Sequence, residues 1–313
     1  MKGGVLLVNK PRGISSYDVI RKIKREASFF KKIGHAGTLD PIAEGLLLIL
    51  FDNATKLFPI LTSYPKVYRA KIRLGVVTDT DDLTGEILER HPVKDFQREE
   101  IISVLKRYEG EIEQIPPIFS ALKEKGLPQY LRARRKEVVS PRARKVKVFW
   151  INLLSWEKES LEIRTEVGKG TYIRALARDI GKALGCGGSV EELKRERIGK
   201  FRVEEAIPFS LLSEKVIKEN CLSIESALYP FPEVTLEKEE IKSLLLGRKI
   251  PIRPNLEWQI PNGKHSSTFI PHPEFLKVFS RDRETLLLVK RLSSSSPLIK
   301  LVRVLYASSE CGK

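Results

Sequence analysis

The 313-residue chain contains three cysteines, Cys186, Cys221 and Cys311, and they lie far apart in the sequence. Isolated cysteines in an odd number, without a Cys-x-x-Cys pair, indicate neither a disulfide framework nor a zinc site. The acidic stretch 78–86 resembles a calcium loop only superficially, because it lacks the required spacing and the closing glutamate. We therefore predict that the protein uses no metal and no cofactor.

Long hydrophobic runs are also missing. No uninterrupted apolar stretch is long enough to span a bilayer, and the N-terminus lacks the apolar region of a signal peptide. We therefore expect a cytoplasmic protein without a membrane partner. The length is sufficient for a substantial core and predicts two domains.

Acidic residues are outnumbered by basic ones. Lys and Arg total 56 against 40 Asp and Glu, which gives a net charge of +16 and a pI of about 9.7. An excess of this size favours a polyanionic partner, with nucleic acid ahead of an anionic membrane surface.

The hydrophobic pattern predicts both strands and helices. Residues 66–75 alternate cleanly, and this pattern places Tyr68 on the apolar face of a strand. Further strands are expected at 4–9, 46–51, 146–150 and 161–167, and helices after Ser15 or Ser16, at 98–109 and from Ile173 to Leu184.

The stretch 34–41, Gly-His-Ala-Gly-Thr-Leu-Asp-Pro, lies between a basic amphipathic segment and a buried strand. Its two glycines and its proline predict a turn. This turn carries an imidazole, His35, and a carboxylate, Asp40. Two interpretations stay open: a catalytic loop, or a turn in which Asp40 caps the backbone and His35 lies on the surface.

Arg174 occupies the first turn of the expected helix, next to Tyr172. A cation is unfavourable there because the N-terminal end of a helix is positive. A carboxylate on a neighbouring loop would satisfy this arginine, although an exposed arginine needs no partner. Tyr68 is either a core residue or a ring presented to a pocket. For Lys10, an ordinary exposed lysine is as good an interpretation as a functional one.

The segment 123–147 is very basic and contains Lys123, Tyr130 and Arg132. Charge runs usually form solvated surfaces. The density of cations, with glycine, prolines and an aromatic residue among them, favours instead a loop that follows a phosphate backbone.

Together these motifs resemble, in order and over nearly the whole chain, the bacterial TruB family of tRNA pseudouridine synthases, which act on uridine 55 of the TΨC loop. The matching stretches are Asn9-Lys10-Pro11 with 13–16, 34–41, Tyr68 in Lys-Val-Tyr, 74–82, 116–123, 170–174 and 184–187. Within the basic segment, residues 127–130 differ from the usual family pattern.

The resemblance implies a role for each matching residue. Asp40 would be the catalytic aspartate, Arg174 its partner, and Tyr68 the residue that stacks on the uracil and assists removal of the C5 proton. The remaining roles concern binding: Tyr172 and Leu193 would line the pocket, His35 would stack on the RNA, Lys10 and Pro11 would support the pocket, and Lys123, Tyr130 and Arg132 would belong to an RNA-clamping insertion. The role of Asp40 stays open between addition to the ribose or uracil and abstraction of a ribose proton.

The implied fold is α+β, with a mixed, mostly antiparallel sheet flanked by helices in residues 1–231 and a small PUA-like β-barrel in residues 232–313. The implied substrate is the T stem-loop of tRNA, bound by a monomer. Three alternatives remain: a guide-RNA-dependent synthase of the same superfamily, a non-catalytic RNA-binding protein or tRNA folding chaperone, and a purely structural basic protein.

Overall fold

The computed structural model describes residues 3–120, 123–124, 127–128, 141–228, 231–251, 274–292 and 298–306. Its strands are β1 Gly4–Lys10, β2 Ile33–His35, β3 Ala43–Phe51, β4 Lys66–Leu74, β5 Val76–Thr78, β6 Ile87–Arg90, β7 Gly110–Gln114, β8 Lys123–Glu124, β9 Leu127–Pro128, β10 Arg144–Glu157, β11 Ser160–Val167, β12 Gly188–Ile198, β13 Phe201–Arg202, β14 Ile207–Pro208, β15 Glu233–Leu236, β16 Ile250–Pro251, β17 Phe275–Ser280, β18 Leu286–Arg291 and β19 Leu298–Tyr306. Its helices are α1 Ser16–Glu26, α2 Phe58–Leu61, α3 Arg98–Lys106, α5 Ile173–Ala183, α6 Glu214–Asn220, α7 Ile224–Ala227 and α8 Lys238–Leu245, with short 3₁₀ turns η1 Asp52–Leu57, η2 Val203–Glu205 and η3 Phe209–Leu211.

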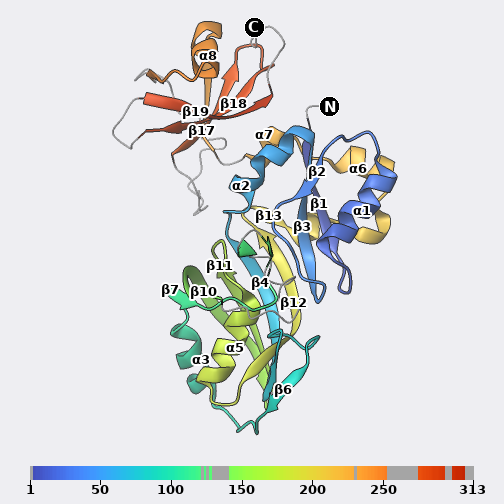
Figure 1. Ribbon diagram of the computed structural model, residues 1–313, viewed down its shortest axis with the longest axis vertical. Coiled ribbons are helices and arrows are strands. Elements are labelled where there is room, and N and C mark those ends of the chain that lie inside the picture. The colour runs from blue at the N-terminus through green and yellow to red at the C-terminus, as the bar shows by residue number, and fades with distance from the viewer. Residues whose placement is uncertain are drawn as a thin grey trace.

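A large mixed sheet runs through the molecule in the order β14-β1-β3-β12-β4-β11-β10-β7, with β2 beside β3 and β13 beside β12. Among the described residues of this sheet, only the β1–β14 and β3–β12 pairs are parallel. The order is not sequential, because β12 inserts between β3 and β4 and so joins segments that are far apart in the chain. Figure 1 shows this strand among its neighbours in the middle of the elongated molecule.

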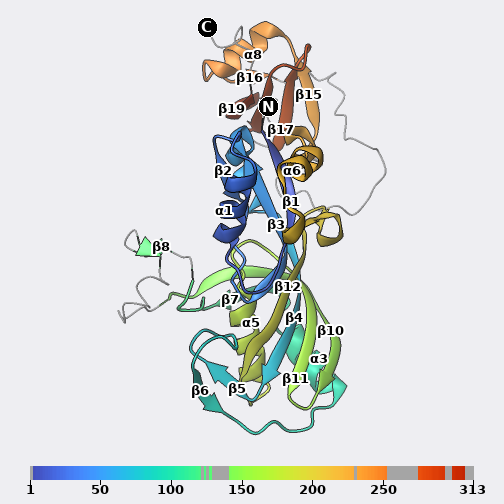
Figure 2. The same cartoon turned by 90° about the vertical axis from the view of Figure 1, so that its right-hand side faces the viewer.

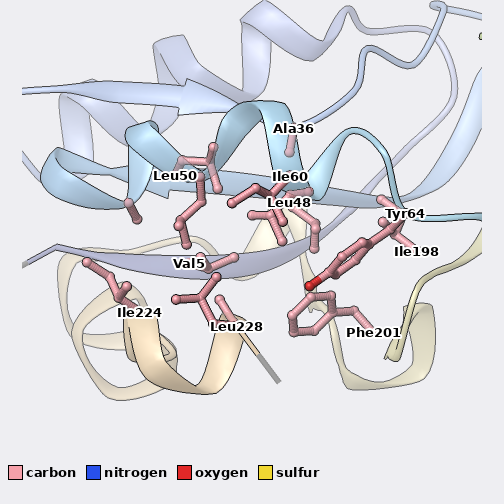
Figure 3. Packing of buried hydrophobic residues seen from close by; sticks show 14 of the residues in the cluster. Val5, Ala36, Leu48, Leu50, Ile60, Tyr64, Ile198, Phe201, Ile224 and Leu228 are labelled. Atoms are coloured by element: carbon pink, nitrogen blue, oxygen red, sulfur yellow. The ribbon is translucent and has the colours of Figure 1, made fainter. Parts of the chain in front are cut away.

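Strands β1 and β3 are buried on both faces, which explains their continuous apolar sequences. Val5 and Leu7 share one core cluster with the segment around α2 and α7, whereas Leu6 and Val8 pack in another with α1 and α6. Figure 3 shows the first cluster, in which Val5 and Leu228 point into a common layer. A third cluster lies between the other end of the sheet and helices α3 and α5.

Local sequence accounts for the start of α1. Ser15 is its N-cap, and Asp18 completes a capping box by accepting from the Ser15 backbone N–H at 2.8 Å. Val19, Ile20 and Ile23 form its buried stripe. This helix therefore begins at a fixed point beside the loop 36–42.

The C-terminal part is a five-stranded sheet of order β15-β17-β18-β19-β16, covered by α8. It lies at one end of the molecule (Figure 2). Phe279, Leu288 and Leu305 of this sheet belong to the same apolar cluster as the segment around α2. Lys56 also donates to the Val304 carbonyl at 2.8 Å. The sheet is thus packed on the rest of the protein.

The α+β class and the mixed, mostly antiparallel sheet agree with the sequence prediction. In the C-terminal part, where a small β-barrel is expected, the described residues form half a barrel: the short edge strands β15 and β16 pair with β17 and β19 and not with each other. The predicted basic loop, 123–147, is also longer than the structure allows. Residues 144–147 belong to β10 and pair with β7, so the loop ends before Arg144.

Candidate active site

Asp40 lies on the loop between β2 and β3, and hydrogen bonds to the backbone of this loop hold it on two sides. Ser16 Oγ accepts from the Leu39 N–H at 2.8 Å and donates to the Leu39 carbonyl at 3.0 Å. The Gly13 N–H donates to the Pro41 carbonyl at 2.7 Å. Gly37 has φ +98°, which a residue with a side chain rarely adopts. The loop is therefore fixed to the start of α1 and to the turn after β1.

Arg195 holds the same loop from behind, and sequence reasoning missed it. Its side chain is 1% exposed, and it donates to the carbonyls of Leu46 at 2.7 Å, Gly37 at 2.9 Å and Thr38 at 3.3 Å. Charge-assisted hydrogen bonds of this kind are stronger than neutral ones. The sequence does contain a signal for Arg195. It lies two positions after Leu193 in β12, and so on the same face of the strand as this apolar residue.

Arg174 makes the partner contact that its helix position called for. Its Nε lies 2.9 Å from Asp40 Oδ2, and because Nε has no aligned hydrogen-bond acceptor, the contact is an ion pair only. The side chain of Arg174 is 6% exposed, whereas that of Asp40 is 38% exposed. The carboxylate is thus open on one side and paired with a buried cation on the other.

Three further contacts fix the guanidinium group. Its Nη1 donates to the Thr80 carbonyl at 2.8 Å and lies 3.5 Å from Asp82 Oδ2, and its Nη2 donates to the Phe119 carbonyl at 2.9 Å. The side chain of Asp82 is 5% exposed. Arg174 therefore links the Asp40 loop to two other loops.

The open side of Asp40 faces a cavity of about 360 Å³. Tyr68, Tyr172, Leu193 and Arg174 line this cavity with Asp40, so the structure brings together five of the residues singled out from the sequence. Its size suits a small ligand group. Two aromatic rings, an apolar wall and one carboxylate suit a planar, uncharged ring that is to be attacked or deprotonated.

Gln114, at the end of β7, fixes the start of α5 and was also missed. Its side chain is buried; Oε1 accepts from the Tyr172 N–H at 2.8 Å and Nε2 donates to the Tyr172 carbonyl at 3.1 Å. Tyr172 is the N-cap of α5 and has no side-chain cap of its own. The amide of Gln114 therefore satisfies this backbone N–H.

His35 lies in a different place from the other site residues. It lines a second cavity of about 600 Å³, which shares Thr38, Leu39, Asp40, Ser120 and Arg174 with the first. Burial, and to a lesser degree the charge of Arg195, lowers the pKa of His35. Its Nδ1 is buried and has no hydrogen-bond partner. The ring is thus favoured in its neutral form beside the Asp40 loop, outside the smaller cavity.

Lys10 is not exposed, and the surface interpretation was wrong. It is fully buried and donates to the carbonyls of Pro11 at 2.9 Å and Ile14 at 2.8 Å. Burial lowers the pKa of Lys10 to about 8, although the charge of Asp40 opposes this shift. Lys10 therefore shapes the turn whose Gly13 holds Pro41.

Of the three residues assigned to the insertion, only Lys123 lies among the described residues. The backbone of Lys123 lies in the two-residue strand β8, and Tyr130 and Arg132 fall outside the described residues. Within the described ranges, no group of three or more His, Cys, Asp or Glu side chains could hold a metal ion. No helix in that part of the chain is long and apolar enough to cross a membrane.

Comparison with known proteins defines the class to which this fold and its paired Asp–Arg site belong. Residues 24–173 match the N-terminal domain model of the TruB family pseudouridylate synthases, and residues 174–231 match the C-terminal domain model of tRNA pseudouridylate synthase B.

Relatives named tRNA pseudouridine synthase B extend the match. The one from Clostridium acetobutylicum is 35% identical over 93% of this chain and 99% of its own length, and the one from Chromohalobacter salexigens is 40% identical over 80% and 82%. A solved chain from a Cbf5–Nop10–Gar1 complex superposes with a TM-score of 0.70 at 26% identity and covers 99% of this chain and 87% of its own. The chain belongs to the TruB family of pseudouridylate synthases.

Proposed function

We propose that this protein is a tRNA pseudouridine synthase that isomerises uridine 55 in the T loop. The observation that carries the proposal is the Asp40–Arg174 ion pair at the edge of a cavity lined by Tyr68, Tyr172 and Leu193. The relatives named tRNA pseudouridine synthase B support tRNA as the substrate.

The target uridine must first leave the RNA stack, at a cost of a few kcal/mol. Stacking on Tyr68 and Tyr172 offsets part of this cost. Leu193, which is 6% exposed, forms an apolar wall that admits the ring and excludes water. Arg174 pairs with the Asp40 carboxylate at 2.9 Å and holds it toward the ring.

The reaction breaks the bond between C1′ and N1, turns the uracil, and forms a bond between C1′ and C5. The C5 proton then leaves and N1 gains a proton, so the product is an isomer of the substrate. Asp40 acts either by adding to the ribose or uracil or by abstracting a ribose proton; both routes use one carboxylate and no redox step. We assign assistance in removing the C5 proton to Tyr68.

The remaining residues act on the RNA outside the reacting ring. His35 stacks on RNA next to the target, Lys10 and Pro11 support the Asp40 loop through Gly13, and Lys123, Tyr130 and Arg132 belong to an insertion that clamps the RNA. We place a catalytic domain at 1–231 and a PUA-like RNA-binding domain at 232–313. The protein would act as a cytoplasmic monomer without a metal.

The test uses bare tRNA transcript and the purified protein alone. We expect one new pseudouridine at position 55, and none when a cytidine replaces that uridine in an otherwise identical transcript. Pseudouridine at another position, with position 55 unmodified, would contradict the proposed specificity.

The superposition on the Cbf5 chain favours a second candidate, a guide-RNA-dependent synthase. That candidate predicts no modification of bare tRNA and activity only after a guide RNA is added. A tRNA folding chaperone role is compatible with catalysis, and it would persist in a variant that binds tRNA but lacks turnover.

A further inference from the structure

The lining of the smaller cavity is strongly unbalanced in charge. Asp40 is the one carboxylate among the described residues that line it. The cations on the same lining are Lys66, Arg144, Lys169, Arg174 and Arg195. A uracil ring is neutral, so the target base alone leaves most of this positive charge without a counter-ion.

Among the residues that the structure describes, most of these cations have no charged partner within the cavity. Arg174 pairs with Asp40, whereas Arg195 donates to three backbone carbonyls. Lys66 donates to the carbonyls of Thr62 at 2.6 Å and Tyr64 at 2.7 Å. Carbonyl groups orient a cation but do not neutralise it. An anion would therefore bind favourably here.

Arg144 is incompletely satisfied as well. Its guanidinium carbon lies 5.0 Å from the centre of the Tyr172 ring, and its Nε and Nη2 are buried without a hydrogen-bond partner. Buried donors without acceptors are rare in folded proteins. Because Arg144 also lines the cavity, an acceptor bound in the cavity is a suitable partner for this guanidinium group.

Burial also disfavours the charged form of Lys66. It is 7% exposed, and burial, with repulsion from Arg195 and Lys169, lowers the pKa of its amine to about 7. Register explains the closeness of the two lysines, because Lys66 pairs with Val167, which lies two residues before Lys169. An anion between them would offset both burial and repulsion.

Lys66 also lies at a suitable distance from the base position. Lys66 and Tyr68 are two residues apart on one strand and so point to the same face, ~7 Å apart. This spacing is comparable to the separation between a nucleotide base and its own phosphate.

We propose that the end of this cavity formed by Lys66 and Lys169, with Arg144 beside it, is a binding site for a backbone phosphate adjacent to the target nucleoside. This inference rests on the proposed function, since it takes the ligand to be RNA. The phosphate fixes the flipped nucleotide while Tyr68 stacks on its base.

The test combines a change in the RNA with a change in the protein. A methylphosphonate removes the charge of one linkage, either 5′ or 3′ to the target uridine, in a T stem-loop RNA. We expect one of the two methylphosphonate substitutions to weaken RNA binding by the wild type about tenfold. The same substitution should not weaken RNA binding by Lys66→Met any further. The log–log salt slope of Lys66→Met should be shallower by about 0.7 to 0.9.

Two variants keep the test decisive. Lys66→Met leaves two carbonyls without a donor, so Lys169→Met, at an exposed position, repeats the cycle with the core intact. Lys182→Met, exposed near the end of α5 and outside the cavity, is the matched control and should respond to the methylphosphonate as the wild type does.

The outcomes separate this inference from the proposed function. The phosphate site would be overturned if, at both linkages, the loss of RNA affinity caused by the methylphosphonate simply multiplied the loss caused by the variant. This result would have to hold for both Lys66→Met and Lys169→Met. Absence of pseudouridine with wild-type protein, while the coupling persists, would count against the proposed reaction only.

Discussion

Replacing Arg174 by methionine should remove two separable functions. The change keeps an apolar stem but leaves Asp82, whose side chain is 5% exposed, without its cation. Breaking a buried ion pair in this way costs about 3–5 kcal/mol. The Asp40 contact adds little to stability because Asp40 is 38% exposed and screened by water. We therefore expect the free energy of unfolding to fall by about 3–5 kcal/mol.

Turnover should fall for a different reason. Without Arg174, Asp40 loses the contact that orients it, and a misplaced catalytic group costs about 100-fold in rate. Adding Asp82→Asn removes the uncompensated buried charge, so the double variant should regain much of the stability. It should not regain turnover, because Asp40 stays unpaired.

The measurements are urea denaturation and tritium release from uracil-C5-labelled tRNA at saturating RNA. Arg178→Met is the matched control: this arginine lies one turn further along α5, pairs with Asp81 and Asp179, and lines neither cavity. Its turnover should stay near that of the wild type. Near-normal turnover by Arg174→Met would show that the Asp40 pairing is incidental. Recovery of turnover in the double variant would show that Arg174 acts through Asp82.

Three further predictions concern residues around the site. Gly45→Ala should lower the free energy of unfolding by at least about 2 kcal/mol, since Gly45 has φ +104° and a Cβ there would lie 2.3 Å from the Arg195 carbonyl oxygen; wild-type stability in denaturant would contradict this. Arg195→Lys should lower kcat more than it raises KM, because an ammonium cannot reach both loop carbonyls, of Gly37 and Thr38, and the Leu46 carbonyl of β3; unchanged kcat would refute its positioning role. The pKa of Lys66 is about 7 in the folded protein and 10.5 in the unfolded chain, so the unfolded chain binds more protons in this window and stability should rise with pH there. Lys66→Met should flatten that part of the curve, and an unchanged slope in denaturation at a series of pH values would show that Lys66 titrates normally.

Sequence reasoning found those features that depend on neighbouring residues. The start of α1 was predicted after Ser15 or Ser16, and the structure has Ser15 as the N-cap. The alternation of 66–75 placed Tyr68 on the buried face of β4. The unfavourable position of Arg174 in α5 left two interpretations, an exposed arginine or one paired with a carboxylate, and the structure pairs it with Asp40. Each of these inferences used contacts within one element or a charge that lacked a local partner.

The features that were missed depend on strand register between distant segments. Arg195 reaches the Asp40 loop because β12 lies between β3 and β4, so that Arg195 pairs with Gly45 on one side and with Tyr68 on the other. Gln114 meets Tyr172 across 58 positions of sequence. Lys10 is buried because β1 pairs with β3 up to Gly45. Periodicity within one segment contains no information on such pairings.

The central claim is that Asp40 performs the chemistry in a cavity that binds the target uridine. The most direct test is tritium release from uracil-C5-labelled tRNA by the wild type beside Asp40→Asn, with tRNA binding measured for both. We predict release by the wild type, no release by Asp40→Asn, and similar binding by the two. Substantial release by Asp40→Asn would contradict the account.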